Sequence, residues 1–385
     1  MSYPTKTGVF TLLAVACLTI MVGCVIVPGI NDVAKGLRVP HGANWLITLP
    51  SLGVVLFAPL AGRCIDRLGA WHTLAAGLLL YGLLGAGAVF LQGVVMVFAE
   101  RLLLGGATAM VMSAGTALIA TFWHGETRLK MMAWQGMSIE LGGVIFLAIG
   151  GVLAEQNWRW PFSLYLCAWL LLLMLWRWVP RVATTNTAGE GENMPTLGNH
   201  PAGLRLAQLA ACSAMIIFFT AIIMIPQHFH AAGISPAMTG YFLSFVSLVA
   251  VAAASQMPRL LQNIRDAQLL SVAFLCLATA HLFFAFATQL PLFIFGGVML
   301  GCGFGFSIPL VNHMTVDYSS APLRGKNLAR LAMAIFSGQF LAAFMVYIPG
   351  DSSRVFSGAA LLSLLVLIGL MHWQRVNKRA ASDLR

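Results

Sequence analysis

The sequence is poor in charged residues. Asp, Glu, Lys and Arg make up only 9% of its 385 residues, whereas a soluble globular domain carries about 25%. Hydrophobic residues make up 59%, and a water-soluble fold of this size cannot bury that much apolar surface. The composition therefore excludes an ordinary soluble protein.

The sequence also lacks the residue patterns of catalysis and of metal binding. Its seven cysteines are scattered without paired metal-ligand spacing. There is no phosphate-binding P-loop and no nucleophile elbow. His228 and His230 stand close together, but two histidines without further ligands make a poor zinc site. We therefore expect neither an enzyme nor a metal site, and no cofactor.

Long apolar runs are what the chain has instead. A helix needs about 20 apolar residues to cross the hydrocarbon core, and twelve stretches are suitable. They lie near residues 8–30, 44–63, 72–92, 94–122, 131–155, 160–179, 204–226, 236–258, 267–288, 290–313, 328–348 and 353–373. These runs are continuous and do not alternate, so they indicate helices and not a β-barrel. The predicted fold class is an all-α membrane protein with twelve transmembrane helices.

Positive charge predicts the orientation of these helices, because short cytoplasmic loops collect Lys and Arg. With the N-terminus inside, 17 of the 22 basic residues fall in cytoplasmic segments. Only Lys35, Arg38, Arg159 and Arg354 face the other side, and Arg101 lies within a span. Both termini are therefore predicted to be cytoplasmic. Membrane topology also explains the net charge of +10 without a nucleic-acid partner.

One polar stretch divides the chain into two halves. Residues 182–203 are rich in Thr, Gly, Asn and Pro and are predicted to form a cytoplasmic linker. Residues 1–181 and 204–385 would then each form a bundle of six helices. A shift of 196 residues superposes Arg128 on Arg324, each just before a Gly/Ala-rich helix. This faint repeat favours two pseudo-symmetric bundles, as in one large class of transporters.

The loop after the second span carries the most specific motif. It resembles the signature loop of the major facilitator superfamily, whose pattern is G-x-x-x-D-R-x-G. The matching residues are Gly62, Asp66, Arg67 and Gly69. Ala70 and Trp71 stand where the family usually has basic residues. The resemblance implies a gate in which Asp66 caps a facing helix and pairs with cations. Pro258 and Gln262 break the corresponding pattern in the second half, so the two gates are expected to be unequal.

Two further segments resemble the drug:proton antiporter branch of this family, and a third is similar to a pattern of the family as a whole. The end of span 1, residues 27–34, is similar to a motif of that branch and contains Asp32. Span 4 is similar to a pattern of the whole family, which it matches at Arg101 and Gly105, while Leu104 replaces the usual Gln. Span 5 carries Gly-Gly pairs and a Trp-Arg-Trp ending, although Phe146 and Leu147 replace the Gly-Pro kink of the antiporters. This departure leaves open uptake of a solute by symport.

Three charged residues are candidates for proton coupling or substrate binding. Glu140 lies about ten residues into an otherwise uncharged span, where a carboxyl group can bind and release protons. Alternatively, it is a structural partner of Arg101. Arg101 faces either a partner in the membrane or, by snorkelling, the outer interface. Asp32 either takes part in coupling or ends a helix in water.

The second half offers possible cavity residues in His281, His313 and Gln339. The two histidines can titrate or bind substrate, or each can satisfy an interhelical hydrogen bond.

The resemblance thus implies a secondary transporter that works by alternating access, and we expect it in a bacterial inner membrane. The resemblance implies proton-coupled efflux of a drug or of an endogenous metabolite such as a siderophore, with proton-coupled uptake as the alternative. The expected partners are a small-molecule substrate, protons and the lipid bilayer, and the chain is expected to function as a monomer.

Overall fold

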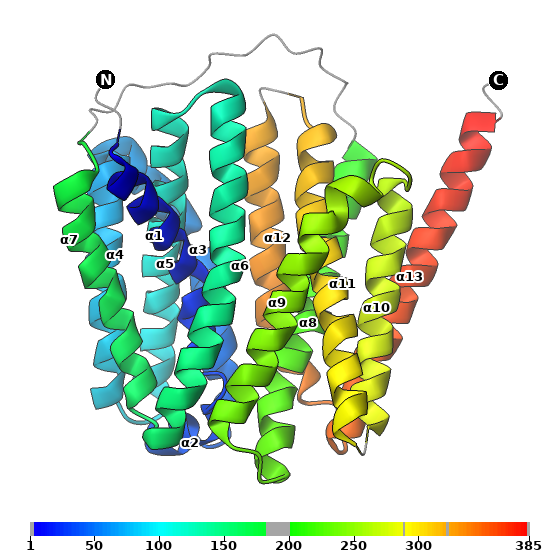
Figure 1. The fold of residues 1–385 in the computed structure, drawn as a ribbon, viewed down its shortest axis with the longest axis horizontal. Coiled ribbons are helices and arrows are strands. Elements are labelled where there is room, and N and C mark those ends of the chain that lie inside the picture. Colours follow the sequence, from blue (N-terminus) through cyan, green and yellow to red (C-terminus); the bar gives the residue numbers. More distant parts are fainter. Residues whose placement is uncertain (1–3, 182–200, 288, 321–322, 383–385) are drawn as a thin grey trace. The chain divides into compact units, whose positions relative to one another are not determined.

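The structure is a computed structural model that describes residues 4–181, 201–287, 289–320 and 323–382. Throughout these ranges the regular elements are helices (Figure 1). Up to residue 181 the α-helices are α1 Lys6–Cys24, α2 Ile30–Gly36, α3 Ala43–Leu68, α4 Ala70–Gly87, α5 Val94–Phe122, α6 Gly125–Gln156 and α7 Cys167–Trp178. From residue 201 they are α8 Pro201–Ala231, α9 Pro236–Leu260, α10 Asp266–Phe286, α11 Leu290–Asp317, α12 Arg324–Met345 and α13 Ser352–Ser382.

Twelve helices within the described residues are long and apolar enough to cross a membrane. Each overlaps one of the twelve apolar runs of the sequence, and the all-α prediction is confirmed. The span that ends with α7 starts as a 3₁₀ segment, Trp160–Leu166, whose second residue is Pro161.

The first apolar run, residues 8–30, is interrupted. Helix α1 ends at Cys24, and the short helix α2 begins only at Ile30. Pro28 and Gly29 lie in the break, where proline cannot donate a backbone hydrogen bond and glycine is a poor helix former. Asp32 therefore lies on a separate helix and not at the end of the first span.

Close contacts group the chain into two compact units. The first consists of Met1–Thr187 with Ile225–Ser247, and the second of Ala188–Met224 with Leu248–Arg385. In the first unit α1 packs against α5, α6 and α7, while α3 and α4 both pack against α5. In the second unit α10 packs against α11 and α13, and α12 contacts both α11 and α13.

Most of the predicted linker, residues 182–200, lies outside the described residues. The division of the chain into two six-helix halves at this linker stays a prediction.

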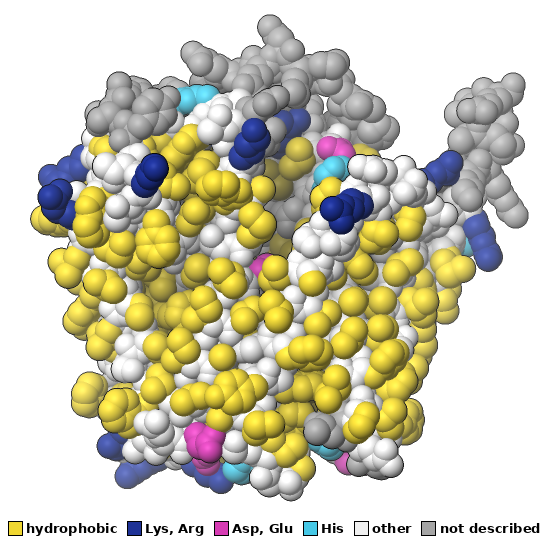
Figure 2. Space-filling view, in the orientation of Figure 1, with side chains coloured by type: hydrophobic (Ala, Val, Ile, Leu, Met, Phe, Trp, Pro, Cys, Tyr) yellow, Lys and Arg dark blue, Asp and Glu magenta, His cyan; other side chains and the backbone are white. Residues whose placement is uncertain are grey.

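Large apolar side chains are exposed on many helices. Phe90, Val95, Leu173 and Phe286 are among the most exposed of them. Figure 2 shows hydrophobic side chains over most of the face in view. Such a surface is unfavourable in water but suits contact with lipid chains. Helices fit this setting because they satisfy their own backbone hydrogen bonds.

Candidate functional site

Glu140 lies well inside the membrane-spanning part of α6. This span begins at Lys130, so a rise of about 1.5 Å per residue places Glu140 about 15 Å along it. The side chain is half-buried, and among the described residues no hydrogen bond or ion pair satisfies its carboxylate. It lies within electrostatic reach of Cys24 at the end of α1. Glu140 is therefore an intramembrane acid without a fixed cation.

Helices α1 and α6 pack closely just beside Glu140. The Cys17 thiol donates a hydrogen bond to the carbonyl oxygen of Ser138 at 2.9 Å. Gly142 faces Cys17, where a Cβ would come within 2.8 Å of the Cβ of Cys17. This contact fixes the segment of α6 that carries Glu140 against α1.

Arg101 belongs to a buried charge cluster on α5. Its side chain has no exposed surface, and its Nε donates a hydrogen bond to the Glu100 carboxylate at 2.7 Å. Its Nη1 donates to the Tyr165 hydroxyl at 3.2 Å, and the guanidinium stands over the rings of Phe162 and Tyr165. This burial rules out snorkelling at the interface for Arg101 in this structure. The pair is not fully satisfied, since Glu100 Oε1 and Arg101 Nη2 have no hydrogen-bond partner among the described residues.

The same cluster caps the broken end of α1. The Tyr165 hydroxyl donates to the carbonyl oxygen of Val22 at 2.8 Å, one of the last carbonyls of a helix that ends at Cys24. Such carbonyls lack an intrahelical partner. Tyr81 donates to the carbonyl oxygen of Leu18, one turn earlier inside α1, at 2.7 Å. Arg101 thus supports the first span through Tyr165, a partner that lies 64 residues away in the chain.

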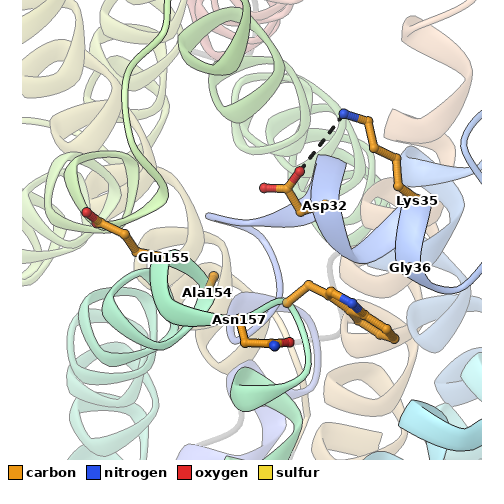
Figure 3. A pocket seen from close by; sticks show the side chains of 7 residues that line it. Asp32, Lys35, Gly36, Ala154, Glu155 and Asn157 are labelled. Atoms are coloured by element: carbon orange, nitrogen blue, oxygen red, sulfur yellow. Dashed lines mark ion pairs between the residues drawn. The ribbon is translucent and has the colours of Figure 1, made fainter.

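Asp32 lines a polar pocket of about 530 Å³ (Figure 3). It is part-exposed and forms a 4.0 Å ion pair with Lys35, one turn further along α2. Glu155 and Asn157, at the end of α6, line the same pocket. The structure therefore brings Asp32 close to the end of α6 and surrounds it with polar groups.

A seam of small residues joins α6 to the first part of α9. The Ser244 hydroxyl donates to the carbonyl oxygen of Val144 at 2.7 Å. Gly151 and Gly240 let the two backbones approach, since a Cβ at Gly151 would lie 3.0 Å from the Cα of Gly240. Both segments belong to the first unit. Close approach through small residues is the usual way in which helices associate in membranes.

The gate motif, expected as a loop, is mostly helical: Gly62, Asp66 and Arg67 lie in the last turns of α3, and only Gly69 stands between α3 and α4. Gly69 adopts a φ of 84°, a left-handed conformation that glycine reaches without strain. Asp66 and Arg67 are exposed, and neither enters an ion pair with any described residue. The expected charge network of this loop stays a prediction.

Arg181, which follows the end of α7, lies beside the start of α4. The Arg181 guanidinium stands 4.7 Å from the ring centre of Trp71 and 5.3 Å from that of Trp176. Trp71 is buried and donates from Nε1 to the carbonyl oxygen of Val179 at 3.1 Å. Arg181 thus brings a positive charge next to Trp71, which stands where the family usually has a basic residue. Sequence reasoning missed it, because Arg181 follows Trp71 by more than 100 residues.

Asp266, at the start of α10 in the second unit, has a hydrogen-bond partner. Tyr318 donates a hydrogen bond to Asp266, and burial together with the Asp266 charge raises the pKa of Tyr318. This acid has a fixed partner, whereas Asp66 in the first unit is exposed.

His281 is packed among aromatic rings in the second unit. It is fully buried, and its Nδ1–H donates to the carbonyl oxygen of Leu277 at 2.9 Å. The rings of Phe284 and Phe356 both lie 6.1 Å from it. Its Nε2 faces the backbone of Ile217 without a well-aligned hydrogen bond. These surroundings favour a packing role.

The other two residues of the second half lie in different surroundings. His313 is exposed and pairs with Asp317 at 3.1 Å, near the end of α11. Gln339 is buried on α12. The three predicted cavity residues are therefore not equivalent in exposure or in partners.

Comparison with known sequences gives a family. A family model described as the Major Facilitator Superfamily matches residues 9–343. The multidrug resistance protein 1 of Bacillus subtilis is 32% identical over 123 residues, which cover 31% of each chain. The puromycin resistance protein pur8 of Streptomyces alboniger is 31% identical over 186 residues, covering 47% of this chain and 37% of that protein. The chain thus matches only about a third of the length of these curated relatives.

Comparison with solved structures gives the fold. A D-xylose-proton symporter superposes with a TM-score of 0.72 at 15% identity, covering 94% of this chain and 96% of the symporter. A peptide transporter in complex with sulfate superposes with a TM-score of 0.74 at 13% identity, covering 96% and 94%. At such low identity, these likenesses show a common fold and nothing about the substrate.

Proposed function

This chain belongs to the Major Facilitator Superfamily, and from that premise we propose that it exports a small molecule in exchange for protons. It is a multi-pass membrane protein with twelve candidate spans. The proposed setting is a bacterial inner membrane with both termini in the cytoplasm, in agreement with the distribution of basic residues.

Glu140 is the observation on which the proposal rests. It is a carboxyl group inside a span, with no fixed cation among the described residues. Such residues are costly in a membrane and commonly belong to proton or substrate pathways. A carboxylate held by a permanent salt bridge would have little reason to change charge, and Glu100 beside Arg101 is an example. Glu140 can lose and regain a proton as its surroundings change.

Alternating access links this protonation to transport. A ligand drives a conformational change only if it binds the two states with different affinity. A proton on Glu140 meets this condition when water reaches the carboxyl group in one state and not in the other. Export then follows if a proton enters from the outside as the substrate leaves. Asp32 is the second proposed acid, while Arg101 shapes the local field through its buried cluster.

The curated relatives support export and a broad class of substrate. Two of them are named for multidrug and puromycin resistance. We propose a drug or an endogenous metabolite such as a siderophore as the cargo.

Uptake by symport is the second candidate function. Helix α6 runs without interruption from Gly125 to Gln156, through Phe146 and Leu147, where antiporters carry a Gly-Pro kink. A continuous α6 without this Gly-Pro pair removes one reason to assign the export direction.

The test is proton movement in proteoliposomes of known orientation. The purified protein would be challenged with cationic drugs, metal chelators and sugars, in the wild type and in Glu140→Gln. Glu140→Asp keeps a carboxyl group and serves as the matched variant. Ser138→Ala, two residues away on α6, controls for nonspecific damage to the helix.

Proton movement opposite to the compound, lost in Glu140→Gln and kept in Glu140→Asp and Ser138→Ala, is the expected result. Movement of proton and compound in the same direction would replace export by symport. Coupled transport that persists in Glu140→Gln would remove Glu140 as the proton carrier.

A further inference from the structure

Glu155, at the far end of α6 from Lys130, makes a contact that the proposed cycle does not yet use. Its Oε2 accepts hydrogen bonds from the Ser235 hydroxyl at 3.1 Å and from the Ala237 backbone N–H at 3.2 Å. These two donors lie at the start of α9. The Ser235 hydroxyl in turn accepts from the Met238 N–H at 3.3 Å. One carboxylate thus satisfies backbone and side-chain donors of another helix.

The physics of this contact is favourable. The first N–H groups of a helix lack intrahelical partners and carry a partial positive charge. A carboxylate placed there is stabilised, and its hydrogen bonds are charge-assisted. At its own position Glu155 lies in the last turn of α6, where the helix dipole disfavours an acid. The start of α9 therefore stabilises the negative charge of Glu155, whereas the end of its own helix α6 does not.

Glu155 stands at the end of the α6–α9 seam. The residues of α6 that take part follow the spacing of one helix face: Val144, Leu147, Gly151 and Glu155. Glu140 continues this stripe by one turn beyond Val144. The latch residue and the proposed proton carrier thus lie on the same face of α6, about 22 Å apart along the helix.

A small cavity of about 10 Å³ lies at this end, between α2, α8 and α9. Thr239, Asn31 and Pro28 are among the residues that line it. Thr239 is only 1% exposed, and it precedes Gly240, the residue of α9 that meets Gly151 in the seam.

From these contacts we propose that Glu155 is the latch of the α6–α9 seam. While its carboxylate holds the start of α9, the seam is closed and water cannot reach the stripe of α6 that contains Glu140 from this end. Release of the latch lets the start of α9 move away from α6 and opens that path. Glu155 is a positioning residue, and its role rests on the alternating-access cycle of the proposed function.

The exposure of Glu155 fits such a role. Hydrogen bonds of exposed groups are weaker than those of buried ones, because water competes for both partners. A latch must open within the microseconds to milliseconds of a transport cycle. A fully buried ion pair such as Glu100–Arg101 would hold the seam too tightly for that.

The experiment measures access to a cysteine introduced at a buried position of α9, beside the seam residue Gly240. Thr239→Cys would be introduced into the full chain, and a membrane-impermeant maleimide would be added on the Glu155 side of the membrane. The labelling rate would be compared between Glu155 and the variants Glu155→Gln and Glu155→Ala. Gln156→Ala, at the exposed neighbouring position, is the matched control. The chain without Thr239→Cys gives the background from the native cysteines.

Loss of the charge-assisted hydrogen bonds is expected to raise the labelling rate about tenfold. The thermal unfolding of the Glu155 variants in detergent should match that of Gln156→Ala, since a general loss of structure would lower it. Labelling at the wild-type rate in both Glu155 variants overturns the latch. So does an equal increase in Gln156→Ala.

This readout is independent of the cargo and of proton coupling. If Glu140→Gln retains coupled transport while the Glu155 variants label faster, the proposed carrier is wrong and the latch stands. If the Glu155 variants label normally while Glu140→Gln loses coupling, the reverse holds.

Discussion

The interiors of the two units are stabilised by different chemistry. In the first unit α5 buries Glu100 and Arg101, and Tyr165 connects this pair to the carbonyl oxygen of Val22 near the end of α1. In the second unit His281 lies among Phe284 and Phe356. None of the described Asp, Glu, Lys or Arg residues of the second unit is buried. Similar membrane helices are thus packed around a charged network in one unit and around neutral aromatic rings in the other.

Among the described residues, the buried charged side chains therefore lie in the first unit. Buried charges lower stability unless they are paired and hydrogen-bonded, whereas a packed aromatic core has no such requirement. Because buried charge occurs in the first unit and not among the described residues of the second, we expect it to serve a role specific to the first unit. The unfixed acid Glu140 and the latch residue Glu155 lie in the same unit as the buried pair.

Removal of Arg101 is expected to have the largest effect on stability. Arg101→Met leaves the Glu100 carboxylate buried without a partner and removes the donor to Tyr165. The free energy of unfolding in detergent should fall by about 3–5 kcal/mol. Chemical denaturation followed by tryptophan fluorescence measures this change.

The double variant Glu100→Leu with Arg101→Met separates stability from function. It makes the first interior apolar like the second, so most of the lost stability should return. Proton-coupled transport in proteoliposomes should stay impaired, because the buried charges are gone. Full coupled transport in the double variant would show that the charged interior has no role in coupling.

A substitution in the neutral interior should have a smaller effect. His281→Leu keeps a side chain of similar bulk and removes two ring nitrogens: Nε2, which has no well-aligned hydrogen bond, and Nδ1, which donates to the carbonyl oxygen of Leu277 in the same helix. Replacement of such a group by an apolar one is nearly neutral, so the change in unfolding free energy should be about 1 kcal/mol or less. Transport should persist. A loss of transport with normal stability would place a titrating group in the second unit and break the contrast.

The sequence predicted the twelve spans because apolar runs of the required length are a strong signal. It did not predict the break between α1 and α2, although Pro28 and Gly29 lie there, since the run stays apolar through the break. The partners of Arg101 and Glu155 were beyond its reach. Tyr165 and Ser235 are 64 and 80 residues away, respectively, and no periodicity within one helix pairs residues at such distances.

The crossing of α6 and α9 provides a reversible test of motion in the first unit. A Cβ built on Gly143 would lie 3.6 Å from the hydroxyl oxygen of Ser247, so cysteines at these two positions would be close neighbours across the seam. Oxidation of the double variant Gly143→Cys with Ser247→Cys should stop transport, and reduction should restore it. Each single cysteine variant, oxidised in parallel, is the control. Undiminished transport with a complete crosslink would show that the seam does not open during the cycle.

The smallest effect is expected from substitution of Arg181, an exposed arginine in contact with aromatic rings. Arg101 and Arg181 each stand over two aromatic rings, but Arg101 is buried and Arg181 is exposed. Arg181→Gln removes only exposed cation–π contacts and should lower the unfolding free energy by about 0.5–1 kcal/mol. Arg181→Lys keeps the charge but loses the planar stacking group, so its unfolding free energy should lie between those of the wild type and of Arg181→Gln. A loss as large as that of Arg101→Met would mean that the rings, and not burial of the charge, determine the cost of removing an arginine from this unit.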